Sequence, residues 1–118
     1  MSRVLIVDDS KFARASLRKL LESLDYEVVG EAVDGADGVK KFKELKTDLI
    51  ISDIEMPKLD GIAMIKEIRT FDDSVKIVVV SSIVSSKIIQ EVVGLRASVV
   101  KKPLKKSKLI NAIELTSR

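Results

Sequence analysis

The chain of 118 residues contains neither cysteine nor histidine. Without cysteine it can form no disulfide and no thiolate-bound zinc site, and it is compatible with a reducing cytosol. Without histidine it can use neither serine–histidine catalysis nor histidine-bound metals nor a histidine pH switch. These absences leave carboxylates, hydroxyl groups and amines as the side chains available for chemistry.

A long hydrophobic run is also missing. No stretch approaches the ~18 consecutive apolar residues that indicate a membrane-spanning helix. The start of the chain, Met1-Ser2-Arg3, leads directly into a predicted strand and has no signal-peptide pattern. We therefore expect a cytoplasmic protein without membrane contact, folded as one domain over residues 1–118.

Aromatic residues make up only 3% of the chain, and the formal net charge is +3. A basic chain can bind nucleic acid, but here acids and bases are interspersed through most of the predicted helices. The densest basic cluster consists of Lys101, Lys102, Lys105, Lys106 and Lys108. We interpret it as solvated lysines plus one functional lysine, in preference to a polyanion-binding patch, and expect no direct nucleic-acid binding.

Short apolar runs rich in β-branched residues alternate with helical patterns. The predicted strands are Val4–Val7, Glu27–Ala32, Leu49–Ser52, Lys76–Val80 and Ser98–Val100. The apolar helical stripes expected to pack in the core are Phe12, Leu17, Leu20, Leu21 and Leu24; Val39, Phe42 and Leu45; Ile62, Ile65 and Ile68; Ile88, Ile89, Val92 and Val93; and Leu109, Ile110 and Ile113. This alternation predicts an α/β fold with a single, doubly wound, mostly parallel five-stranded sheet and five helices on its two faces.

Acidic residues follow two of the predicted strands. Asp8 and Asp9 end the first apolar run, and Asp53 ends the third. In open parallel sheets, ligands bind beyond the carboxyl ends of the strands, so these three carboxylates are expected to converge. Crowded carboxylates repel one another unless a hard cation such as Mg²⁺ joins them. Asp9 or Ser10 could instead cap the following helix, a role that is compatible with metal binding.

Asp53 is the candidate nucleophile. Asp60 is better placed to cap the helix that begins near Gly61, and Pro57 marks a loop, so Asp53 remains free for chemistry. A carboxylate can accept a phosphoryl group, and that transfer mainly requires positioning and neutralisation of charge. Mg²⁺ and a lysine can supply the neutralisation.

A lysine and a serine complete the predicted site. Successive strand residues point to opposite faces, so only one of Lys101 and Lys102 should reach the acids, and we favour Lys102. Ser81 and Ser82 follow the fourth strand, and either could donate to a phosphoryl oxygen or serve only a local turn. We favour Ser81 as the hydroxyl partner.

Four segments together resemble the receiver domain of two-component response regulators, over the whole chain. They are Val4-Leu5-Ile6-Val7-Asp8-Asp9-Ser10, the stretch from Asp53 to Gly61, Val80-Ser81-Ser82 and Lys102-Pro103. The resemblance implies a flavodoxin-like strand order 2-1-3-4-5. It implies that Asp53 is the phosphoacceptor, that Lys102 contacts the phosphoryl group and that Ser81 is the switch hydroxyl. The Mg²⁺ ligands it implies are Asp8, Asp9, Asp53 and the backbone carbonyl of Glu55.

The same resemblance implies a signalling switch rather than a conventional enzyme. Such a domain takes phosphate from a sensor histidine kinase or a small phosphodonor and catalyses its own dephosphorylation. Its output partner is expected on the face formed by the fourth helix, last strand and fifth helix. Asp53–Pro57 with Ser81-Ser82 also resembles the receiver of chemotaxis methylesterases, although the chain is equally compatible with a stand-alone receiver and with a piece of a longer protein.

Some residues depart from the family pattern. Val99 stands where relatives often carry an aromatic, which puts an aromatic switch coupled to Ser81 in question. The segment Val93–Ala97 lacks the usual Gly-Ala turn, so we expect an unusual end to the fourth helix. Glu55, two residues after Asp53, is expected to alter the rate of autodephosphorylation.

Two rival functions remain open. A metal-dependent phosphatase with an aspartyl nucleophile would usually carry a second aspartate where Glu55 stands, together with a cap domain. A receiver-like binding module could keep the fold and act without phosphorylation. The set of Asp8, Asp9, Asp53 and Lys102 argues against that module. Nucleotide binding is disfavoured because no glycine-rich phosphate loop is present.

Overall fold

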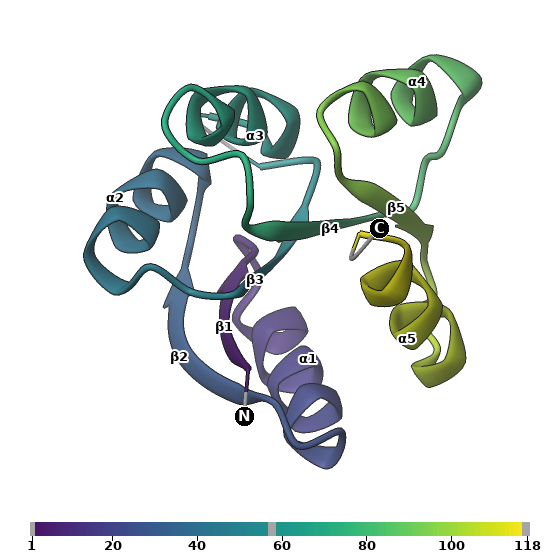
Figure 1. The fold of residues 1–118 in the computed structure, drawn as a ribbon. Coiled ribbons are helices and arrows are strands. Elements are labelled where there is room, and N and C mark those ends of the chain that lie inside the picture. Colours follow the sequence, from purple (N-terminus) through teal and green to yellow (C-terminus); the bar gives the residue numbers. More distant parts are fainter. Residues whose placement is uncertain (1, 57–58, 117–118) are drawn as a thin grey trace.

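A computed structural model describes residues 2–56 and 59–116 of the chain (Figure 1). Pro57, predicted to mark a loop, lies outside the described residues. Strands and helices alternate in the order β1 (Arg3–Val7), α1 (Lys11–Ser23), β2 (Glu27–Ala32), α2 (Gly35–Leu45), β3 (Leu49–Asp53), α3 (Gly61–Arg69), β4 (Lys76–Ser81), α4 (Ser86–Gly94), β5 (Ser98–Lys101) and α5 (Lys106–Leu115). None of the helices found in the described residues has the length and apolar character needed to cross a membrane.

The five strands form one sheet in the order β2-β1-β3-β4-β5, and every neighbouring pair is parallel. The predicted α/β fold and its strand order are confirmed. Parallel neighbours need crossover connections, and each crossover here contains a helix. All five strands consequently present their carboxyl ends along the same edge of the sheet.

Helices cover both faces of this sheet. α1 and α5 lie on one face, and α2, α3 and α4 lie on the other (Figure 1). Along β1 the side chains alternate between two buried clusters: Leu5 packs with the layer of α2, α3 and α4, whereas Val4 and Ile6 pack with that of α1 and α5. Since both faces are covered, the inner strands β1, β3 and β4 are buried over nearly their whole length, and this accounts for their continuous apolar runs.

For four residues of the predicted core stripes, the prediction that they are buried is wrong. Phe12 is 82% exposed because it lies five positions before Leu17, a spacing that puts it off the buried side of α1. On α4 only Ile88 and Val92 face the core, and their neighbours Ile89 and Val93 are exposed. The fourth is Ile110, also exposed, next to the buried Leu109 on α5. The hydrophobic stripes thus predicted the helices correctly but assigned too many residues to the side of each helix that faces the core.

The end of α4 is unusual in the predicted place. Arg96 adopts a left-handed conformation, with φ of 58°, where a glycine is the common residue. Its N–H donates to the Val93 carbonyl at 2.9 Å, and the Ala97 N–H donates to the Val92 carbonyl at 3.1 Å. The guanidinium of Arg69 also donates to the carbonyls of Leu95 and Arg96. These bonds satisfy carbonyl groups at the end of the helix without the Gly-Ala turn that is usual in the family.

Candidate functional site

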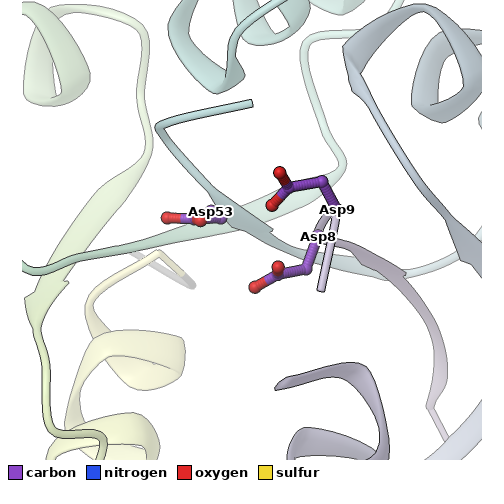
Figure 2. A group of neighbouring side chains, drawn as sticks. All are labelled: Asp8, Asp9 and Asp53. Atoms are coloured by element: carbon purple, nitrogen blue, oxygen red, sulfur yellow. The ribbon is translucent and has the colours of Figure 1, made fainter. Parts of the chain in front are cut away.

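Three carboxylates meet at the carboxyl edge of the sheet (Figure 2). Asp8, Asp9 and Asp53 each offer a ligand oxygen, and these oxygens all lie within 4.8 Å of one another. The pairing of Val7 with Ser52 in neighbouring strands explains the meeting, since the next residue on each strand is then an aspartate. The convergence predicted from the strand ends is present in the structure.

Asp8 is buried, with 7% of its surface exposed, and it is held by the backbone on two sides. Its N–H donates to the Ala32 carbonyl at 3.0 Å, and its Oδ1 accepts from the Ser10 N–H at 2.9 Å. The hydroxyl of Ser10 caps α1 by accepting from the Ala13 N–H. Because Ser10 performs the capping, Asp9 can remain in the carboxylate cluster.

Asp53 ends β3 with its side chain mostly buried. Burial raises the pKa of this carboxyl above its usual value, and the charge of Asp8 adds to the effect. Lys102 and the backbone N–H of Ile54 act in the opposite direction but do not cancel it. An acidic side chain with a raised pKa gains most from any further positive charge brought beside it.

Two features fix the loop between β3 and α3: a helix cap formed by Asp60 and a close approach of Gly61 to the backbone of Asp53. Asp60 accepts from the Ala63 N–H at 2.8 Å and so caps α3, as the sequence predicted. A Cβ on Gly61 would lie 2.3 Å from the Asp53 carbonyl oxygen, a separation that only glycine permits. The Gly61 N–H donates to the Ile54 carbonyl at 2.9 Å. Asp53 is therefore not needed for capping, and its backbone is tightly packed.

Lys102 is the lysine that reaches the acids. Its Nζ lies 3.6 Å from Asp53 Oδ1, whereas Lys101 is exposed at the end of β5. The Lys102 N–H donates to the Ser81 carbonyl at 2.8 Å, and the bond from Lys102 to Pro103 is cis. The remaining lysines of the basic cluster are exposed, which fits their interpretation as solvated side chains.

Ser81 occupies the predicted place but its hydroxyl points elsewhere. It is 1% exposed, and its Oγ donates to the Ile83 carbonyl at 2.9 Å and accepts from the Ile83 N–H at 3.2 Å. This is the local turn that the sequence left open as an alternative. Ser82 is exposed. Glu55 is exposed in the loop that follows β3, and its carboxylate is not a member of the cluster of three aspartates.

The donor set fits a hard divalent cation. Carboxylate oxygens are the ligands preferred by Mg²⁺, and three of them converge here from two neighbouring strand ends. Asp8 and Asp53 are also largely removed from water, so their mutual repulsion is poorly screened. The residues that could hold the ion are Asp8, Asp9 and Asp53.

An open cavity of about 680 Å³ adjoins the carboxylates and was not predicted. Its lining includes Phe12 and Leu17 of α1, Pro103 and Leu104 after β5, and Asp53. The five-residue spacing from Phe12 to Leu17 is the sequence signal that could have indicated an aromatic near the site. A second feature that was missed, an ion pair between Arg14 and Glu31 at 2.9 Å, lies beside Asp8.

Comparison with known proteins gives a consistent result. The family model of the response regulator receiver domain matches residues 4–114. The chain is 39% identical to the chemotaxis protein CheY of Thermotoga maritima over 117 residues, which is 98% of each chain. The response regulator domain of Thermotoga maritima CheB superposes with a TM-score of 0.88 at 35% identity, over 99% of this chain and 96% of that one. A chain in the crystal structure of the CheX–CheY–BeF₃–Mg²⁺ complex from Borrelia burgdorferi superposes with a TM-score of 0.90 at 30% identity, over 95% of this chain and 86% of that one.

Proposed function

Because the chain belongs to the family of response regulator receiver domains, we propose that it is a phosphorylation-dependent signalling switch with Asp53 as the phosphoacceptor. The observation that carries the proposal is the position of Asp53. Its carboxylate has a raised pKa, lies beside Asp8 and Asp9, and has the ammonium group of Lys102 at 3.6 Å. The three carboxylates favour the binding of a cation, and the cation together with Lys102 can neutralise the charge of a phosphoryl group at Asp53.

In the proposed reaction an Asp53 oxygen attacks the phosphorus of the donor. An O–P bond forms as the donor's bond to phosphorus breaks, and the leaving group departs with that electron pair. The donor is the phosphohistidine of a sensor kinase or a small acyl phosphate. Lys102 stabilises negative charge on the phosphoryl oxygens. Mg²⁺, held by Asp8, Asp9, Asp53 and the Glu55 carbonyl, would neutralise the charge that the two reacting groups bring together.

The change of state is proposed to involve Ser81. Its hydroxyl now bonds within its own turn, to Ile83. Phosphorylation adds charge and strong acceptor oxygens at Asp53, toward which this hydroxyl could turn. Val99, packed against the core, replaces the aromatic of many relatives, so the motion that follows is expected to differ from an aromatic flip.

Proposed partners are a sensor histidine kinase and an output protein. We assign the output to the face of α4, β5 and α5, where Ile89, Val93 and Ile110 are exposed. The CheY relatives support a role in chemotaxis. A cytoplasmic location is part of the proposal and is consistent with the absence of cysteine.

The direct test is the intact mass of the protein after incubation with acetyl phosphate and Mg²⁺. We expect the wild type to gain one phosphoryl group and Asp53→Ala to gain none while keeping its circular dichroism spectrum. Lys102→Ala should be phosphorylated more slowly, and its matched control Lys101→Ala should resemble the wild type. A wild type that takes up no phosphoryl group would instead favour the phosphorylation-independent binding module.

Glu55 is proposed to influence the water that removes the phosphoryl group. Its exposed carboxylate, two residues beyond Asp53, could repel or orient that water. Phosphate release from phosphorylated wild type and Glu55→Ala should therefore differ in rate. Identical rates would remove Glu55 from the mechanism.

A further inference from the structure

Arg14 links α1 to two other parts of the molecule. Its Nε lies 2.9 Å from Glu31 Oε1 on β2, and one of its terminal nitrogens donates to the backbone carbonyl of Asp8 at 2.8 Å. Only 14% of the arginine side chain is exposed. The planar guanidinium can make both bonds at once, so its position and that of Asp8 are coupled.

Arg14 binds Asp8 in the short connection between β1 and α1, outside the hydrogen-bonding pattern of the strand and of the helix. Asp8 lies after the end of β1 and before the start of α1 at Lys11. Its N–H and its carboxylate are bonded to the backbone of Ala32 and Ser10, and Arg14 binds the third group, the carbonyl. With all three groups bonded, the peptide of Asp8 has little freedom to rotate.

Arg18 provides an internal comparison. Its Nε also lies 2.9 Å from the Glu31 carboxylate, on the other oxygen. Its second bond, however, runs to the Val28 carbonyl at 3.4 Å, on β2 rather than at the site. Both arginines thus stabilise Glu31, but the bond to the Asp8 carbonyl comes from Arg14.

We propose that Arg14 is a positioning residue of the metal site: held by Glu31, it fixes the main chain of Asp8 so that the Asp8 carboxylate faces Asp9 and Asp53 before a cation binds. Groups that orient metal ligands raise affinity because the ordering is already complete in the free protein. This inference rests on the proposed function, since it requires the three aspartates to bind Mg²⁺. It adds a residue that touches neither the ion nor the phosphoryl group.

The test is a titration of the ¹⁵N-labelled protein with Mg²⁺, following the amide signals of Asp8, Asp9 and Asp53. Arg14→Ala is expected to weaken Mg²⁺ binding about tenfold, the lower end of the range for residues that orient ligands. Arg14→Lys should also bind Mg²⁺ more weakly than the wild type, since a single ammonium group cannot reproduce the two guanidinium bonds to Glu31 and to the Asp8 carbonyl. The matched control Arg18→Ala, which loses the same carboxylate partner, should stay within about twofold of the wild type.

Unfolding in urea, measured for each variant without Mg²⁺, separates positioning from stability. Both arginine variants are expected to lose stability, but only changes at Arg14 should alter the Mg²⁺ affinity. An unchanged affinity in Arg14→Ala, or in Arg14→Lys if the alanine variant does not fold, would overturn the inference and leave the proposed function intact. Equal weakening by Arg14→Ala and Arg18→Ala would also overturn it. A wild type without Mg²⁺-dependent shifts at the three aspartates would overturn both proposals.

Discussion

Two carboxylates near the same edge of the sheet have opposite surroundings. Glu31, near the end of β2, forms an ion pair with Arg14 and another with Arg18, and in each the Nε atom lies 2.9 Å from a carboxylate oxygen. Burial acts to raise its pKa, but the bonds from Arg18 and Arg14 outweigh this and hold the pKa below its usual value. Asp53, at the end of β3, has one ammonium group at 3.6 Å, lies beside Asp8, and has a raised pKa.

The difference distinguishes an acid whose charge is neutralised within the fold from the acid proposed to accept the phosphoryl group. The charge of Glu31 is satisfied within the fold, so it ties α1 to β2 and has little to gain from a ligand. The charge of Asp53 is only partly neutralised within the fold. Binding a cation beside this carboxylate, alone or together with a phosphoryl group, therefore releases free energy. The surroundings of each carboxylate, rather than its residue type, therefore indicate its role.

The largest expected effect on stability comes from removing the satisfied acid. Glu31→Ala leaves the guanidinium of Arg14 without its carboxylate partner in a mostly buried position. We expect the free energy of unfolding to fall by about 2 kcal/mol, less than for a fully buried pair because Arg18 reaches water. Urea unfolding measures this loss. The control Glu44→Ala, at an exposed position on α2, should change stability by less than about 0.5 kcal/mol.

Removing the unsatisfied acid should have the opposite sign. Asp53→Asn keeps the shape of the side chain and its bond from the Ile54 N–H. It removes the cost of burying a charge and the repulsion with Asp8, which together outweigh the lost attraction to Lys102. In buffer without divalent cations the free energy of unfolding should therefore rise, by an amount on the order of 1 kcal/mol. Added Mg²⁺ should then stabilise the wild type more than the variant. A variant less stable than the wild type in metal-free buffer would contradict this account of Asp53.

The smallest effect is a pH dependence of the Glu31 contribution. Because its pKa is lower in the folded chain, its stabilising effect is fully present above the ordinary glutamate pKa of 4.5 and is lost as the pH falls through the folded pKa. The stability difference between wild type and Glu31→Gln should therefore shrink on acidification below pH 4.5. Urea unfolding at successive pH values would reveal it. A difference that stays constant or grows would mean that the ion pairs do not control this carboxyl.

Much of this arrangement could be predicted from the sequence. Continuous β-branched runs could only be strands covered on both faces, and parallel strands bring their carboxyl ends to one edge. These two rules were sufficient to bring Asp8, Asp9 and Asp53 together. Asp60 as the cap of α3 likewise followed from local chemistry.

Features that depend on rotation about a helix axis or a single bond were not predictable. The five-residue spacing from Phe12 to Leu17 indicates that the two side chains lie on different sides of α1, but how α1 is turned against the sheet decides which of them is exposed. The Arg14–Glu31 pair depends on that same rotation, because α1 must turn the side that carries Arg14 toward β2 for the pair to form. The hydroxyl of Ser81 has two partners within reach of rotation about χ1, and the residue type alone cannot select between them.

The most direct test of the central claim is to locate the phosphoryl group within the chain. Borohydride reduces an acyl phosphate to an alcohol, which would mark a phosphorylated aspartate as homoserine. After treatment with acetyl phosphate and Mg²⁺, reduction and peptide mass mapping, we expect homoserine at position 53 and unmodified acids at positions 8, 9 and 31. Modification at another carboxylate with Asp53 unchanged would contradict it.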